Sequence, residues 1–138
     1  MNQVTEVARD ESGRVQRAEE RTPEYMHALL SAYYDDKWNV NDSVLKTLVK
    51  WRDWPIVVRM PDISADYTVM IDEGRVTNIE IGKPAQARLL VVMNSQTQEK
   101  IYFEETTAAI EAIAGRIKIR GNETERRRML AAISYLTW

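Results

Sequence analysis

The stretch Gly115-Arg-Ile-Lys-Ile-Arg-Gly-Asn122 decides the predicted fold of this chain. Side chains alternate between the two faces of a β-strand, so Ile117 and Ile119 share one face and the three cations between and beside them share the other. That alternation predicts a strand over residues 116–120 with one buried face and one solvated face. Gly121, which follows the strand, supplies a turn.

A helix is predicted directly after this turn, over residues 123–136. Asn122 is a favourable N-cap, and Glu125 stands three residues further on, as in a capping box. An apolar stripe follows at helical spacing, formed by Met129, Ile133 and Leu136. Strand, turn and amphipathic helix together form one packing unit.

A β-hairpin is predicted in the middle of the chain. Apolar and polar side chains alternate over residues 65–71 and strand character returns over 76–81, and Asp72-Glu73-Gly74-Arg75 between them is a typical hairpin turn. A shorter strand is expected at 56–60. Residues 87–93 are almost continuously apolar, which predicts a central strand covered on both faces.

Four further helices complete the predicted order. Thr22-Pro23 begins the first, and Asn41-Asp42-Ser43 begins a second that runs until Pro55 ends it. Asn94 or Ser95 caps a third helix with Gln98 in the capping-box position, and a fourth covers about residues 106–114. The resulting order indicates an α+β domain, in which a mainly antiparallel sheet carries its helices on one face.

Composition narrows the range of functions. The chain has 138 residues, 44% of them hydrophobic and 29% charged, as in an ordinary soluble domain. A net charge of -2 argues against general nucleic-acid binding. With no cysteine and a single histidine, neither a thiolate metal site nor a multi-histidine metal site is possible. No catalytic constellation, metal site or cofactor motif is found, so we expect no enzyme activity.

The N-terminal residues 1–21 are polar and carry many charges, so we expect a mobile tail or a frayed helix there. The folded domain is accordingly expected to cover residues 22–138. The longest apolar run, residues 89–93, is far shorter than the roughly 20 residues of a membrane-spanning helix. No secretory signal is recognised at the N-terminus either, and the expected location is the cytoplasm.

Residues 56–136 resemble the sterol carrier protein 2 (SCP2) family of lipid-binding domains. The resemblance lies in the order of the hairpin at 67–81, the apolar strand at 87–93, the helical pair, and the stretch 115–122 with its helix. The family pattern at this stretch is Gly-Lys-Ile-Lys-Ile-x-Gly-Asp, where this chain has Arg116 and Asn122 in place of Lys and Asp. The resemblance implies a five-stranded sheet covered by helices, an apolar tunnel between them, and carriage of sterols, fatty acids or acyl-CoA without catalysis.

Apolar side chains of the predicted helices and strands are the candidates for lining such a tunnel. Methionine suits a site that accepts varied lipids, because it is flexible and polarizable. The alternative is that these positions simply form the core. The candidates are Met26, Leu30, Leu48, Trp51, Met70, Met93, Ile101, Phe103, Ile110, Met129, Ile133 and Leu136.

The cations of the 116–120 strand are candidates for binding an anion. Arg116, Lys118 and Arg120 would receive a CoA phosphate, a lipid headgroup or, transiently, an anionic membrane surface. The alternative is a solvated strand face screened by nearby acids.

Two functional hypotheses follow from these observations. The first is a carrier of a lipid or acyl ligand. The second is an SCP2-like interaction module with a filled core, for example one that forms a homodimer.

Overall fold

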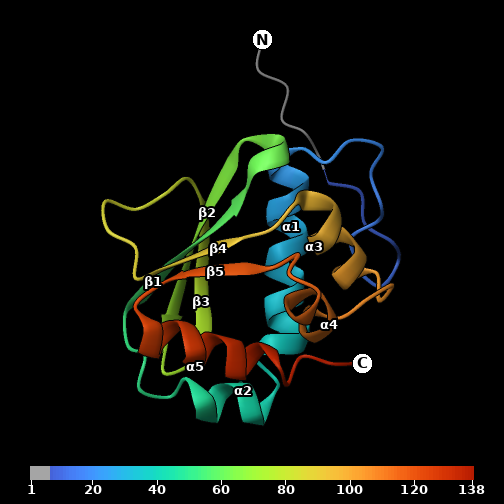
Figure 1. Cartoon of the computed structure of the whole chain (residues 1–138). Helices are drawn as coiled ribbons and strands as arrows, with labels where there is room; N and C mark the ends of the chain where they lie inside the picture. Colours follow the sequence, from blue (N-terminus) through green and yellow to red (C-terminus); the bar gives the residue numbers. More distant parts are fainter. Residues whose placement is uncertain (1–6) are drawn as a thin grey trace.

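The computed structural model describes residues 7–138, which form a single α+β unit (Figure 1). Its strands are β1 (Trp54–Met60), β2 (Ala65–Asp72), β3 (Arg75–Ile81), β4 (Leu89–Val92) and β5 (Lys118–Gly121). Its α-helices are α1 (Pro23–Tyr33), α2 (Asp42–Thr47), α3 (Ser95–Tyr102), α4 (Ala108–Ile113) and α5 (Glu123–Ile133). A π-helical turn η1 (Tyr34–Trp38) extends α1, and a 3-10 turn η2 (Pro61–Ile63) follows β1.

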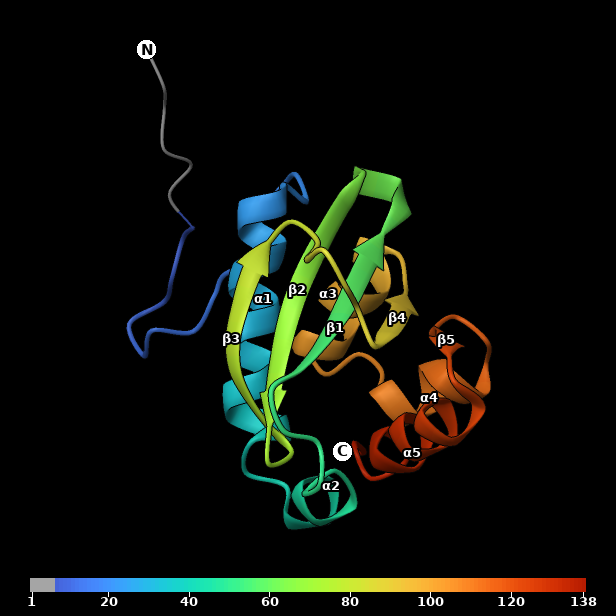
Figure 2. The same cartoon turned by 90° about the vertical axis from the view of Figure 1, so that its left-hand side faces the viewer.

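The described residues form one five-stranded sheet in the order β3-β2-β1-β4-β5. β1 and β4 are parallel, whereas β1 with β2, β2 with β3, and β4 with β5 are antiparallel. α1 and α3 lie behind the β1–β3 part of the sheet in Figure 2. The predicted mainly antiparallel α+β fold is therefore confirmed.

The sheet buries one face. Along β2 the inward side chains are buried and the outward ones are half-buried, as the period of a strand requires. β4 follows the same pattern, since Leu89 and Val91 are buried while Leu90 and Val92 are half-buried on the outer face. β4 is an interior strand, as predicted, but full coverage of both its faces was wrong, because Leu90 and Val92 on the outer face are only half-buried.

The hairpin turn between β2 and β3 packs closely against the second helix. Glu73 and Gly74 both adopt left-handed backbone conformations, with φ of 51° and 85°, which are the values of a tight hairpin turn. Trp38 Nε1 donates a hydrogen bond to the Gly74 carbonyl at 2.8 Å. A Cβ on Gly74 would lie 2.7 Å from the backbone oxygen of Leu45, so glycine is required there for space as well as for conformation.

α2 is shorter than predicted. It begins at Asp42, where the Asn41 side chain caps it, but it ends at Thr47 rather than continuing towards Pro55. The Trp51 amide then bonds to the Leu48 carbonyl at 2.9 Å, and Asp53 has a left-handed φ of 47°. This turn leads the chain into β1. A helix that continued to residue 54 would leave no room for the turn, which is why α2 ends early.

The N-terminus of α3 is capped from another part of the chain. The Ser95 amide and hydroxyl donate to the Asp62 carboxylate of η2 at 2.9 and 2.5 Å. Within the described residues the Asn94 side chain makes no capping hydrogen bond. The carboxylate also interacts favourably with the positive end of the helix dipole. We predicted Gln98 as a capping-box residue, but Asp62 supplies this cap instead, so the Gln98 side chain is not needed to cap α3.

Residues 7–21, here called the N-terminal segment, pack against α3. Within this segment no helix forms, and Val15 is only 1% exposed. The Val15 amide donates to the Tyr102 hydroxyl at 3.0 Å, while the guanidinium groups of Arg14 and Arg17 lie over the rings of Tyr102 and Phe103. The frayed helix that was one of the two expectations is thus not formed within residues 7–21, and residues 1–6 lie outside the described part.

Glu99 of α3 anchors this segment electrostatically. Its side chain is 8% exposed and accepts from the Tyr25 hydroxyl at 2.7 Å, with Arg21 Nη1 at 3.4 Å and Arg17 Nε at 3.9 Å. Burial, together with the hydrogen bond to Glu99, raises the pKa of Tyr25 to about 12. Tyr25 therefore stays protonated and keeps donating to the carboxylate.

Replacement of Gly74 by alanine should destabilise the protein by about 2–4 kcal/mol, from backbone strain plus steric overlap with Leu45. Gly13→Ala is the matched control, because Gly13 has the same φ of 85° but, apart from itself and its two chain neighbours, no residue of the described part has a heavy atom within 4 Å of the added carbon. The free energy of unfolding of the control should fall by only about 1–2 kcal/mol. Urea unfolding of both variants measures the difference, and equal losses would contradict the close approach.

Glu99→Ala should release the N-terminal segment and lower stability by about 1–2 kcal/mol, less than for a fully buried pair because both arginines are partly exposed. Trypsin should then cleave after Arg14 and Arg17 faster than in the unmodified protein. Glu104→Ala is the control, since Glu104 is an exposed acid paired with Lys37 at 3.4 Å. Unchanged cleavage in the Glu99 variant would show that Glu99 does not hold the segment.

Candidate functional site

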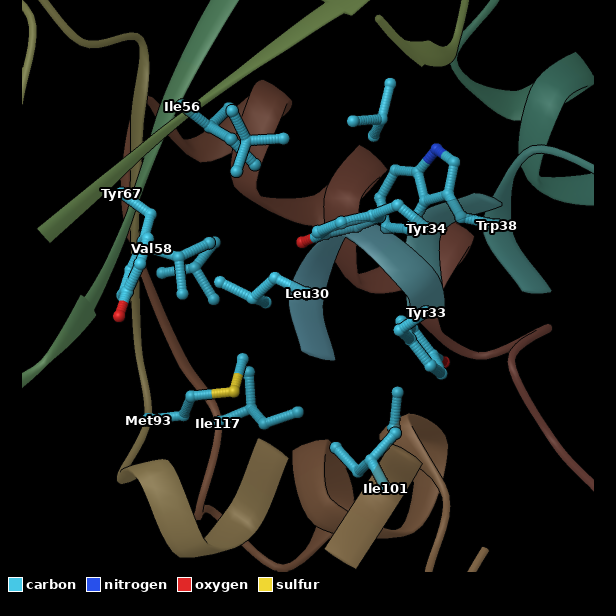
Figure 3. Packing of buried hydrophobic residues seen from close by; sticks show 14 of the residues in the cluster. Leu30, Tyr33, Tyr34, Trp38, Ile56, Val58, Tyr67, Met93, Ile101 and Ile117 are labelled. Carbon is cyan, nitrogen blue, oxygen red and sulfur yellow. The ribbon is translucent and has the colours of Figure 1, made fainter. Parts of the chain in front are cut away.

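A small space lined by buried residues, here called the core cavity, lies between the inner face of the sheet and the helices. Its free volume is about 30 Å³. Figure 3 shows part of its wall, where Ile101 and Met93 approach from one side and Tyr34 and Ile56 from the other. The lining residues are Tyr33, Tyr34, Trp38, Ile56, Val91, Met93, Gln98, Ile101, Ala108, Ile117, Met129, Ile133 and Leu136.

The aromatic wall of the cavity comes from the junction of α1 and η1. Tyr34 and Trp38 meet edge to face, with ring centroids 5.2 Å apart. The Trp38 indole is fixed by its hydrogen bond to Gly74, so the β2–β3 turn holds one wall of the cavity in place. Both side chains belong to η1, where the π-helical turn replaces the regular spacing of α1.

The cavity has one notable polar group. Gln98 is 3% exposed, and its Nε2 atom has no hydrogen-bond partner among the described residues. Burial raises the pKa of the Tyr33 and Tyr34 hydroxyls, so both stay protonated. Among the lining residues of the described chain none is Lys, Arg, His, Asp or Glu, so the interior is uncharged.

A groove of about 380 Å³, here called the C-terminal groove, lies outside the cavity. Tyr33, Ile101 and Leu136 line both the groove and the cavity. Trp138 at 73% exposure and Val40 at 68% exposure line the groove on its outer side. The groove and the core cavity therefore adjoin at these three shared side chains, and the rest of the groove lining is mostly polar, with Asp36, Lys37 and Glu104 among it.

The predicted tunnel residues fall into three groups. Met93, Ile101, Met129, Ile133 and Leu136 line the core cavity. Met26, Leu30, Leu48 and Trp51 are buried core residues that do not line it. Met70 is half-buried on the outer face of β2, Phe103 is half-buried beneath Arg17, and Ile110 is 44% exposed. We therefore leave the last three out of the candidate site.

Sequence reasoning missed several lining residues. The helical pattern that contains Tyr33 and Tyr34 changes its period at residue 34, and Ile56 and Val91 were predicted only as strand residues. Gln98 was assigned to the helix cap. The one signal that would have pointed to Gln98 is its position three residues before Ile101, on the same side of a helix.

The predicted anion-binding cations have different surroundings. Arg116 forms a two-oxygen pair with Glu111, at 3.0 Å from Nε to each oxygen and 2.5 Å from Nη2 to Oε2. Lys118 and Arg120 are exposed on β5. Lys118, Arg116 and Lys100 also border a groove of about 610 Å³ that contains Glu105 and Glu111. Arg116 is thus engaged by a protein carboxylate, which leaves Lys118 and Arg120 for an external anion.

Residues 7–138 contain no cluster of three or more His, Cys, Asp or Glu side chains that would hold a metal ion. None of the helices in this part of the chain is long and apolar enough to span a membrane.

The Arg116–Glu111 pair should make stability depend on pH. The Arg116 hydrogen bonds hold the pKa of Glu111 below its usual 4.5, so the pair stabilises the folded state above pH 4.5 and loses this effect as pH falls through the lowered pKa. Arg116→Gln should therefore lower the melting temperature at pH 7 but not once Glu111 is protonated. Lys118→Gln, which removes the same charge two residues away, should show no such pH dependence. If Arg116→Gln still lowered the melting temperature in acid, where Glu111 is protonated, the pairing would be contradicted.

No protein-family model matches the sequence, and a search of the curated proteins found no match. Solved structures with a similar fold do exist. One is a UbiJ-SCP2 ubiquinone synthesis protein, at TM-score 0.55 and 10% identity over 84% of this chain and 94% of that one. Another is sterol carrier protein 2 like 2 from Aedes aegypti, at TM-score 0.51 and 14% identity over 78% and 92% of the two chains.

A third similar structure is the inverting sec-alkylsulfatase Pisa1 from Pseudomonas sp., at TM-score 0.51 and 14% identity. The match covers 86% of this chain but only 17% of the sulfatase, so the chain corresponds to a small part of that enzyme. At such identities the comparisons establish architecture rather than activity. The sheet order, the helices on one face and these similarities together show that the chain has an SCP2-like fold.

Proposed function

We propose that this protein binds an apolar, lipid-like ligand in the core cavity and does so without catalysis. The observation that carries the proposal is a cavity lined by buried, uncharged residues, three of which also line the C-terminal groove. The names of two similar structures, a sterol carrier protein and a ubiquinone synthesis protein, support an apolar ligand. Within this class, a fatty acid, an acyl-CoA or a sterol-like molecule are the expected candidates.

Binding requires the cavity to expand. Its free volume of about 30 Å³ is roughly a tenth of the ~300 Å³ that a small-molecule site needs. Met93 and Met129 can change rotamer at low cost, and Tyr33, Ile101 and Leu136 would move to join the cavity to the C-terminal groove. Burying the ligand's apolar surface, at about 25 cal/mol per Å², would offset the cost of this opening.

Charged parts of a ligand would remain outside. Lys118 and Arg120 are the cations left for a phosphate, a headgroup or an anionic membrane surface, because Arg116 is paired with Glu111. An acyl-CoA would accordingly place its chain in the cavity and its phosphates at the surface. We also propose that the protein acts in the cytoplasm.

The second candidate function is that of an interaction module, such as a homodimer, with a filled core. The small free volume of the cavity favours it. Three exposed apolar side chains that line the C-terminal groove also favour it as a contact surface, namely Val40, Tyr135 and Trp138. The two functions differ in whether the core accepts a ligand.

Met129→Trp should weaken binding of a fluorescent fatty acid at least tenfold, because the larger ring occupies the space that the ligand chain needs. Native mass spectrometry of the unmodified protein, followed by organic extraction, should also detect a co-purifying lipid near one-to-one stoichiometry. Circular dichroism establishes whether the variant is folded. If Met129→Trp does not fold, Ile133→Phe replaces it in the binding test, because it adds a smaller volume to the same cavity.

Val49→Trp is the control, because Val49 is 51% exposed and is not a lining residue of the cavity. It should bind the fatty acid as the unmodified protein does. Unchanged affinity in a folded Met129→Trp protein would place the ligand elsewhere. A ligand-free protein that also fails to take up the fatty acid would favour the interaction module.

A further inference from the structure

We propose that the ligand of the core cavity carries an uncharged hydrogen-bond acceptor, such as a ketone or ester carbonyl, and that Gln98 Nε2 donates to it. This inference rests on the function proposed above and specifies the ligand's buried chemistry. It departs from the expectation that the polar part of the ligand stays at the surface cations.

The first argument is the state of Gln98 in the ligand-free protein. Its amide is enclosed at 3% exposure, it lines the cavity, and Nε2 has no partner within residues 7–138. A buried donor without a partner is rare in folded proteins, because leaving it unpaired costs free energy. Glutamine at a position that faces an apolar space therefore calls for a partner that the protein itself does not provide.

The second argument concerns charge. The cavity wall contains no cation among its described lining residues, so a carboxylate placed beside Gln98 would be desolvated without a counter-ion. A neutral carbonyl oxygen, in contrast, accepts from Nε2 without that cost. The Tyr33 and Tyr34 hydroxyls in the same wall remain protonated and are further donors. The interior thus favours an acceptor and disfavours an anion.

The third argument concerns water. The free volume of about 30 Å³ exceeds the roughly 10–15 Å³ that a cavity needs to hold one water molecule. Such a water would satisfy Gln98 in the ligand-free protein, and a ligand that displaces it must replace its hydrogen bond or lose affinity. The cavity therefore favours a ligand with an acceptor both when it is empty and when it first holds a water molecule.

The test compares two ligands that differ only in the acceptor. Methyl undecyl ketone and tridecane have the same number of carbon atoms, and each is titrated against protein loaded with the fluorescent fatty acid. The unmodified protein should bind the ketone about tenfold more tightly than the alkane, the equivalent of one hydrogen bond. Gln98→Met, of similar length and without a donor, should remove this preference by weakening ketone binding.

Gln96→Met is the matched control, because Gln96 lies on the same helix and is exposed. It should keep the tenfold preference. Equal binding of ketone and alkane by the unmodified protein, or an undiminished preference in Gln98→Met, would overturn this inference and leave the proposed function standing. Failure of the fatty acid itself to bind would overturn both.

A spectroscopic measurement makes the test independent of any variant. The infrared carbonyl band of methyl undecyl ketone bound to the unmodified protein should lie at lower wavenumber than in hexane, because a hydrogen bond weakens the C=O bond. A bound ketone with the hexane frequency would show that no donor reaches it, and the inference would fail.

Discussion

The parallel pairing of β1 with β4 is the constraint on which the rest of the structure depends. It aligns Ile56 with Leu89 and Val58 with Val91, and so joins the β1–β2–β3 meander to the β4–β5 pair. A two-stranded ribbon alone is marginal in water. The core cavity spans this junction, because Ile56 lines it from one half of the sheet and Val91 from the other. α3 and α4, inserted between β4 and β5, then supply the facing wall.

Local sequence patterns predicted the elements well, because alternation and capping act over a few residues. The hairpin at β2 and β3 followed from the placement of apolar side chains. So did β5, although it covers Lys118–Gly121 rather than the predicted 116–120, so that Ile117 precedes it and Gly121 is its last residue instead of a turn. Strand order did not follow, since pairing between distant strands leaves no local trace. The coverage of β4 was misjudged for the same reason, because it depends on which elements lie above Leu90 and Val92.

The candidate site was only partly predictable. Met129, Ile133 and Leu136 were found because a regular helix puts them on one face. Tyr34 was missed because η1 departs from the regular helical period. Gln98 was assigned to a cap that Asp62, 33 residues away from Ser95, in fact provides. A residue released from its expected local role in this way becomes available to a ligand.

The contacts of the N-terminal segment also bear on the order in which the chain assembles. Val15 and the Tyr102 hydroxyl, which are hydrogen-bonded, are 87 residues apart in sequence. Such a contact closes a very long loop, so its entropic cost is repaid only once α3 is already in place. We therefore expect the segment to dock last during folding and to open first under native conditions. Amide hydrogen exchange at Val15 that is as slow as in β1 would contradict this order.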